Sequence, residues 1–186
     1  MSNSTTQYIA ILRGINVSGH RLIKMDQLKQ MITTLGFHQV STYIQSGNIV
    51  FSTVKKESSI IAEIISTKIL EQFSFEVPTI VLLKEEMEQI IKSNPFLKDP
   101  KKDPSFFYIT LLSEKPNPKL YDLLKAEKNQ PDEFILEGST IYLYCPNGYG
   151  KTKLTNGFFE KKLNVMATTR NWKTINELLK IAKHSS

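Results

Sequence analysis

The sequence has 186 residues, of which 40% are hydrophobic and 23% are charged. That balance supports a packed core and excludes an intrinsically disordered chain, and no apolar stretch reaches the roughly 20 residues of a membrane-spanning helix. A single cysteine, Cys145, excludes a disulfide framework and a zinc site built from several thiolates. Three scattered histidines argue against a histidine-rich metal site, so we expect no metal and no cofactor. The N-terminus also lacks an apolar signal core, and these features together predict a cytoplasmic protein without a membrane partner.

The net charge of +6 is concentrated in the last quarter of the chain. Residues 145–186 contain eight Lys or Arg and two Glu, whereas residues 1–144 contain 16 basic and 16 acidic residues. Such a positive field favours an anionic partner. An ordinary solvated basic surface explains the same excess equally well.

The first half of the chain predicts the order strand, helix, strand, strand, helix, strand. Apolar, β-branched and aromatic runs predict strands at 7–12, 40–44, 49–52 and 77–83. Apolar residues at spacings of three and four predict helices at 25–35 and 58–73, the second one capped by Ser58. A further helix is expected at 84–92, before a segment at 93–105 that holds three of the eight prolines and predicts a linker.

The second half repeats that order with weaker signals. Strands are expected at 106–112, 134–136, 141–144 and 167–169, and helices at 118–126 and 155–163. Asn171 is expected to cap a final helix. The sequence therefore predicts an α+β protein of two tandem βαββαβ modules of ferredoxin-like type, with antiparallel sheets and an extra C-terminal helix. The N-terminal module would span 1–92, the linker 93–105 and the C-terminal module 106–186.

Four loop segments are dense in polar residues: 13–19, 45–48, 149–156 and 168–172. Four motifs, three of which include these loops, carry a resemblance to a known family, and they run from Leu12 to Gly19, from Thr42 to Phe51, through Asn94-Pro95-Phe96, and from Gly148 to Trp172. The chain resembles the bacterial family known as domain of unknown function 1697, with Ser18-Gly19 where a Gly-Gly pair is common. The resemblance implies a fold of two ferredoxin-like modules and implies no activity.

Two loops of the first half are candidate ligand sites. Arg13 and Asn16 lie in a loop with Gly14 and Gly19, where backbone N–H groups and a guanidinium could bind phosphate or carboxylate. Gln45, Ser46 and Asn48 could present amides and a hydroxyl to a ligand. The structural alternatives are an ordinary strand–helix connection, in which Asn16 bonds its own backbone, and a hairpin turn in which Gly47 supplies the positive φ.

The second half holds the other candidates. The segment from Cys145 to Thr152 resembles a phosphate-binding loop, but Cys145 replaces its first glycine and too little chain follows for a nucleotide hydrolase. Lys153, Thr155 and Asn156 open a predicted helix, whose free N–H groups favour an anion. Arg170 and Asn171 open the last helix, where a cation opposes the helix dipole, so that Arg170 points to function or to a salt bridge with an acid such as Glu160.

These observations leave three functions open. The first is a binding module for a phosphate-bearing or other anionic ligand, with RNA as the nucleic-acid version, since the first module shares the element order of RNA-recognition domains and places Tyr8 on its first strand. Its site would bring Lys153, Asn156 and Arg170 together, with Arg13 and Gln45 from the other module. The second is an enzyme acting on a small anionic substrate at a cleft between the modules, although no nucleophile or general base is evident. The third is a structural or partner-binding protein, of undetermined oligomeric state.

Overall fold

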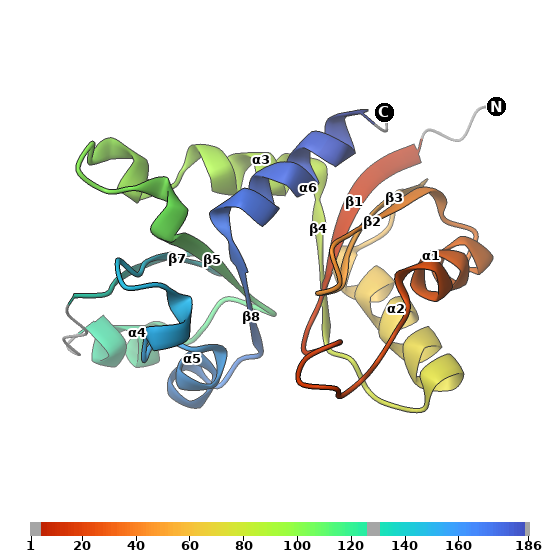
Figure 1. Cartoon of the computed structure of the whole chain (residues 1–186), viewed down its shortest axis with the longest axis horizontal. Coiled ribbons are helices and arrows are strands. Elements are labelled where there is room, and N and C mark those ends of the chain that lie inside the picture. The colour runs from red at the N-terminus through yellow and green to blue at the C-terminus, as the bar shows by residue number, and fades with distance from the viewer. Residues whose placement is uncertain (1–4, 126–130, 185–186) are drawn as a thin grey trace. The chain divides into compact units, whose positions relative to one another are not determined.

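The computed structural model describes residues 5–125 and 131–184 (Figure 1). The chain divides into two compact units, one made of residues 1–89 with 177–186 and the other of residues 90–176. The sequence predicts the end of the chain to be part of the C-terminal module, whereas in the structure residues 177–184 cluster with the first unit. The division falls inside two helices, α3 (Lys84–Lys92) and α6 (Trp172–His184).

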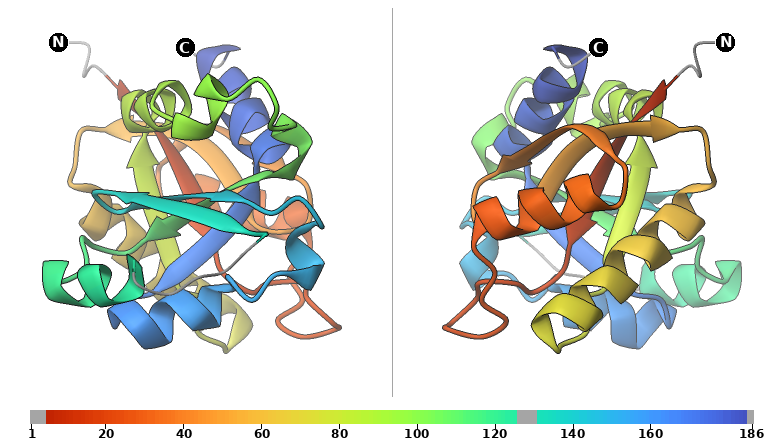
Figure 2. Two further views of the ribbon diagram at one scale, coloured as in Figure 1. Left: turned by 90° about the vertical axis from the view of Figure 1, so that its left-hand side faces the viewer. Right: turned by 90° about the vertical axis from the view of Figure 1, so that its right-hand side faces the viewer.

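The first unit is built on one antiparallel sheet with the strand order β2-β3-β1-β4. Its strands are β1 (Thr5–Leu12), β2 (His38–Tyr43), β3 (Asn48–Val54) and β4 (Thr79–Leu83). Its helices α1 (Met25–Thr34) and α2 (Ser58–Phe73) cover the same face of the sheet (Figure 2, right). The element order matches the predicted βαββαβ order. The predicted cap of α2 is wrong. Glu57, and not Ser58, occupies the N-cap, and its side chain makes no capping hydrogen bond.

Aromatic residues of the sheet form the centre of the first unit's core. Tyr8 and Phe51 are fully buried and stack with ring centroids 5.9 Å apart, and Phe37 stacks on Phe51 at 4.8 Å. The Tyr8 hydroxyl donates to the Lys56 carbonyl at 2.7 Å. Because side chains alternate across a strand, the opposite face of β1 presents aliphatic Ile9 and Ile11, which are also buried.

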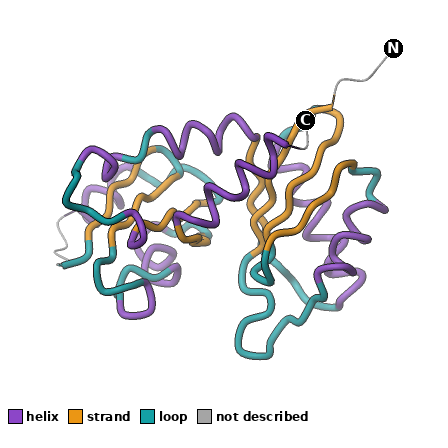
Figure 3. Tube along the Cα trace, turned by 45° about the horizontal axis from the view of Figure 1, so that its top comes forward, coloured by secondary structure: helices purple, strands orange, loops and turns teal. Residues whose placement is uncertain are grey.

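The second unit repeats the arrangement with the strand order β6-β7-β5-β8. Its strands are β5 (Phe107–Leu112), β6 (Glu133–Glu137), β7 (Thr140–Tyr144) and β8 (Ala167–Asn171). Its helices are α4 (Pro118–Lys125) and α5 (Asn156–Leu163). Phe159 and Leu163 of α5 pack with Leu112 and Leu143 of the sheet. Figure 3 colours the strands of both sheets orange. The chain is thus α+β, with two four-stranded antiparallel sheets and helices on them.

The predicted linker contains regular structure of its own. Two short 3-10 helices, Pro95–Lys98 and Pro104–Phe106, begin after Asn94 and Asp103, each of which accepts a backbone N–H bond. Phe96 is buried, with ring centroids about 6 Å from those of Phe107 and Tyr144. The Lys102 ammonium lies 4.3 Å from the centre of the Tyr144 ring and contacts the Glu133 carboxylate. The segment is therefore packed onto β7 rather than extended freely.

Candidate functional site

The Asn16 side chain holds the loop after β1. Its amide nitrogen donates to the carbonyls of Ile23 (3.0 Å) and Gln45 (2.8 Å), and its amide oxygen accepts from the Ile23 N–H (2.9 Å). Asn16 has φ +55°, a left-handed conformation that asparagine tolerates better than most residues. Two of these bonds close the loop after β1 and the third joins it to the β2–β3 turn, so the Asn16 amide serves the structure of the loops.

The β2–β3 turn also uses its polar groups internally. Buried Asn48 donates from its amide nitrogen to the Tyr43 carbonyl (3.0 Å) and to the Ser46 hydroxyl (2.9 Å). Gly47 has φ +75°, and its carbonyl accepts from Leu12 N–H at 2.8 Å. The side chains of Ser46 and Asn48 therefore shape the turn.

Arg13 and Gln45 lie at the same end of the first sheet. Arg13 is half-buried directly after β1, and its N–H donates to the Pro78 carbonyl at 2.9 Å. The side chain of Gln45 is exposed, while its carbonyl accepts the bond from Asn16. Arg13 and Gln45 are thus brought together at one end of the sheet, the end that carries the loop after β1 and the β2–β3 turn.

In the second unit, α5 begins as the sequence predicts. Thr155 is the N-cap, and its hydroxyl accepts from the Phe158 N–H at 3.2 Å. Asn156 and Gly157 supply the first N–H groups of α5, which have no acceptor inside the helix. Lys153 is exposed just before this start.

A chain of hydroxyl groups orients the Asn156 side chain. The Thr169 hydroxyl donates to the Asn156 amide oxygen at 2.6 Å and accepts from the Tyr149 hydroxyl at 3.2 Å. The Thr110 hydroxyl lies 2.6 Å from the same Thr169 oxygen. Because the one proton of Thr169 is directed at Asn156, Thr110 must be the donor of that contact. The Asn156 amide nitrogen is not part of this hydroxyl network and donates to no described residue.

Three residues of this hydroxyl network, Tyr149, Thr110 and Thr169, were not predicted as site residues from the sequence. Thr110 and Thr169 are partners in the β5–β8 register, and the rings of Tyr149 and Tyr108 lie 5.1 Å apart. The Tyr108 hydroxyl accepts from the Tyr149 N–H at 3.3 Å. Pairing the two predicted strands in register would have placed the threonines together. We call Tyr149, Lys153, Thr155, Asn156 and Thr169 the α5 site.

The Arg170 side chain and the Thr169 hydroxyl of the α5 site lie on opposite faces of β8. Thr169 faces Thr110 and Asn156, so Arg170, the next residue of β8, points to the opposite face of the strand. Its guanidinium donates to the Thr168 hydroxyl (3.1 Å) and to the Thr169 carbonyl (2.9 Å). Burial lowers the pKa of Arg170 to about 10, which leaves it charged at neutral pH.

Asn171 acts as the sequence predicts. Its side-chain oxygen accepts from the Thr174 N–H at 2.8 Å, which caps α6. The side chain is exposed and its position is explained by that bond.

Cys145 is a buried thiol without a catalytic setting. Burial raises its pKa to about 11; the Thr152 hydroxyl lowers it and the Asp132 carboxylate raises it further. The Thr152 hydroxyl donates to Asp132 at 2.6 Å and accepts from the Leu154 N–H at 3.0 Å. The Thr152 hydroxyl at the end of the segment that resembles a phosphate-binding loop is therefore already bonded to Asp132 and Leu154, and the Cys145 thiol is protonated at neutral pH.

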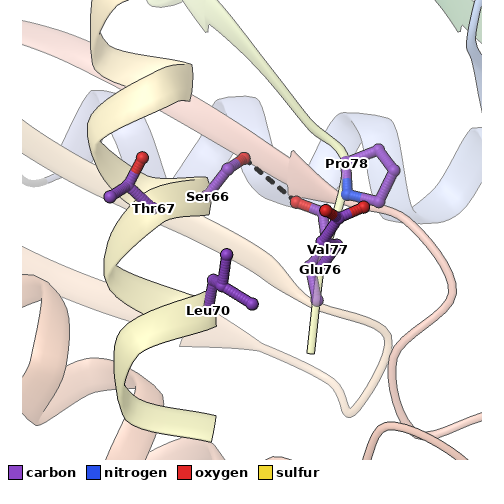
Figure 4. Close-up of a pocket in the computed structure, with 6 residues that line it drawn as sticks. All are labelled: Ser66, Thr67, Leu70, Glu76, Val77 and Pro78. Atoms are coloured by element: carbon purple, nitrogen blue, oxygen red, sulfur yellow. Dashed lines mark hydrogen bonds between the residues drawn. The ribbon is translucent and has the colours of Figure 1, made fainter. Parts of the chain in front are cut away.

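Two open grooves on the helix face of the first unit do not suit an anion. The groove in Figure 4 holds about 280 Å³ between α2 and the segment before β4, where the Ser66 hydroxyl donates to the Val77 carbonyl. The charged residue of this groove is Glu76. The second groove, of about 400 Å³ between α1 and α2, is lined by Glu63, Glu71 and Lys68.

Among residues 5–125 and 131–184, no three His, Cys, Asp or Glu side chains gather to hold a metal ion.

The likeness to RNA-recognition domains does not extend to their stacking residues. Those domains stack bases on aromatic side chains of the sheet. Here Tyr8 and Phe51 point into the core between sheet and helices.

The described part of the chain has no helix that is both long and apolar enough to cross a bilayer.

Comparison with known proteins identifies the family. The model of the family described as "Protein of unknown function (DUF1697)" matches residues 5–142. The match includes the first three segments that carry the resemblance, while the segment from Gly148 to Trp172 lies beyond it. No curated protein matches the chain.

A solved structure has the same fold. It is the conserved bacterial protein SP0830 from Streptococcus pneumoniae, which is 21% identical in sequence. The superposition has a TM-score of 0.71 and covers 96% of this chain and 99% of that one. Because the family model covers well over half of the sequence, the chain belongs to the DUF1697 family of proteins of unknown function.

Proposed function

We propose that the chain is a binding protein for a small phosphate-bearing anion, and that the α5 site holds this ligand. The proposal rests on Asn156, whose amide oxygen accepts from Thr169 and whose nitrogen donates to no described residue. The first N–H groups of α5 and the ammonium of Lys153 add further donors at the same helix start. Donors without acceptors select an anion over a neutral ligand.

The charge of the second unit supports the same ligand class. Residues 90–176 contain 14 Lys or Arg and nine Asp or Glu, an excess of five positive charges. The first unit, by contrast, is close to neutral, with ten basic and nine acidic residues. An anion is therefore attracted to the unit that carries the α5 site, with a strength that falls as salt is added.

We also propose that each unit is a ferredoxin-like module and that the protein works in the bacterial cytoplasm. The module assignment is supported by the βαββαβ order and by the antiparallel strand orders β2-β3-β1-β4 and β6-β7-β5-β8. The setting is supported by the single, reduced cysteine and by the bacterial origin of the similar solved structure.

Thermal unfolding with inorganic phosphate and pyrophosphate tests the proposed ligand. A ligand at about 100 times its dissociation constant stabilises the fold by about 2.7 kcal/mol, which raises the melting temperature of a chain this size by roughly 5–10 °C. The Asn156→Asp substitution should abolish the shift, because a carboxylate replaces the amide donor. It should not unfold the protein, because an acid is favoured at a helix start.

Two matched variants separate a site from general charge attraction. Lys153→Gln should weaken the shift, whereas Lys180→Gln, which removes an exposed charge from α6, should leave it unchanged. Equal shifts in wild type, Asn156→Asp and Lys153→Gln, or no shift with either anion, would contradict the proposal.

A further inference from the structure

The loop after β1 and the β2–β3 turn expose an unusual amount of apolar surface. Val17, Leu22 and Ile44 have 57%, 66% and 49% of their surface accessible. Single exposed aliphatic residues are normal on a protein. These three, however, are each adjacent in sequence to one of Asn16, Ile23 and Gln45. The side-chain amide of Asn16 bonds the backbone of the other two and so brings the three sites together. We call residues 13–24 and 43–47 the loop platform, and Figure 2, right, shows its first loop projecting beyond the end of the sheet.

The backbone of the loop platform is held in an unfavourable conformation. Asn16, Ser18, Arg21 and Ile44 all have φ between +49° and +55°, and such values are genuine outliers for a β-branched residue such as Ile44. The Asn16 bonds and the Asn16 N–H bond to the Arg21 carbonyl (3.2 Å) hold the loop in this form. A fold retains strain of this kind where a surface must keep one shape, and a preformed surface loses less entropy when it binds.

The charged residues within the loop platform are all basic: Arg13, Arg21 and Lys24. The exposed side chains of Arg21 and Lys24 flank Leu22, and no acidic residue occurs at 9–25 or 38–56. A complementary surface therefore carries carboxylates around an apolar centre. Tyr43 is the one aromatic residue of the loop platform and is half-buried, so the exposed apolar residues of these loops are aliphatic and not the aromatic ones that anchor proteins at a lipid interface.

We propose that the loop platform is a docking surface for an acidic polypeptide segment that inserts an apolar side chain between Leu22 and Ile44. The partner's carboxylates would pair with Arg21 and Lys24. This role is separate from anion binding at the α5 site, which belongs to the other unit. It gives a use to the two family segments in which Asn16, Ser46 and Asn48 shape the loops.

Selection of a displayed library of random linear peptides on the purified full chain tests this surface. We expect enriched peptides that combine Asp or Glu with apolar residues. Leu22→Ser and Arg21→Glu should each weaken their binding by about tenfold or more, since every 1.4 kcal/mol is tenfold. Both side chains are exposed, so the melting temperature should not change.

Two control variants match these substitutions elsewhere on the surface. Leu123→Ser removes an equally exposed leucine from α4, and Lys29→Glu reverses an exposed charge on α1; both should leave peptide binding unchanged. The proposal is overturned if no peptide is enriched or if enriched peptides bind Leu22→Ser as well as wild type. It is equally overturned if phosphatidylglycerol vesicles, rather than peptides, bind the protein in a Leu22-dependent way.

Discussion

Gly47 has less room for a side chain than any other described glycine. A Cβ at this position would lie 2.7 Å from the Leu12 Cβ and 2.8 Å from the Ile15 Cδ1, and the residue has φ +75°. We expect Gly47→Ala to lower the free energy of unfolding by about 2–4 kcal/mol, from overlap and from the left-handed backbone. Urea denaturation measures the loss.

Gly150→Ala provides the control for that substitution. Nothing lies within 4 Å of a Cβ at Gly150, and its φ is not positive. Its effect should stay within about 0.5 kcal/mol. A Gly47→Ala variant as stable as Gly150→Ala would show that the β2–β3 turn is not packed as described.

Asn16 makes three side-chain hydrogen bonds that no aliphatic residue can replace. We expect Asn16→Ala to cost about 2–4 kcal/mol of stability, because a buried backbone N–H and two carbonyls lose their partner. Asn147→Ala, at an exposed position with an ordinary backbone, should be nearly neutral. Chemical denaturation of the two variants should separate them, and equal midpoints would refute this role of Asn16.

At the scale of elements, α5 depends on its N-cap. Thr155→Ala removes the acceptor for the Phe158 N–H and should cost about 1 kcal/mol, whereas Thr155→Ser keeps that acceptor and should restore most of the loss. The comparison is made by thermal unfolding of the three proteins. If serine were no better than alanine, the hydroxyl would not be the stabilising group.

The elements themselves could be predicted from the sequence because their signals are local. Helix α2 has apolar residues at helical spacing and spans 58–73 as predicted, and β1 is a continuous apolar run. The short 3-10 helices at 95–98 and 104–106 were not predicted, because each depends on a side chain bonding the backbone two residues on, Asn94 to Phe96 and Asp103 to Ser105. Each of these helices begins with a proline, and in the sequence alone a proline indicates the end of a helix or strand, so the segment was predicted as a linker.

The candidate site was less predictable than the fold, since it depends on which face a side chain occupies. Thr169 and Arg170 are adjacent in sequence, and the charged residue was the more obvious candidate. Only the β5–β8 register, with Thr110 opposite Thr169, shows that the threonine lies beside Asn156. Likewise, nothing in the composition of 13–24 indicates that Asn16 reaches the β2–β3 turn, since that contact joins residues 29 positions apart.

At the scale of the whole molecule, stability should fall when the pH rises above about 9. Burial raises the pKa of Cys145 from 9.0 to about 11, and burial followed by the Glu137 charge raises that of Tyr142 from 10.0 to about 12. A group whose pKa is higher in the folded state contributes stability that is complete below its unfolded pKa. That stability is lost as the pH rises through the folded value, because the unfolded chain ionises first.

The Cys145→Ala variant isolates one part of this alkaline loss. At neutral pH it should be somewhat less stable than wild type, because a buried sulfur is removed. Between pH 9 and 11, however, its free energy of unfolding should fall less steeply, since one of the two groups no longer ionises. Arg170, whose lowered pKa acts in the opposite direction, is the same in both proteins and cancels in the difference. Denaturant unfolding at a series of pH values gives the two slopes, and parallel slopes would mean that the Cys145 thiol ionises equally easily in the folded and unfolded chains.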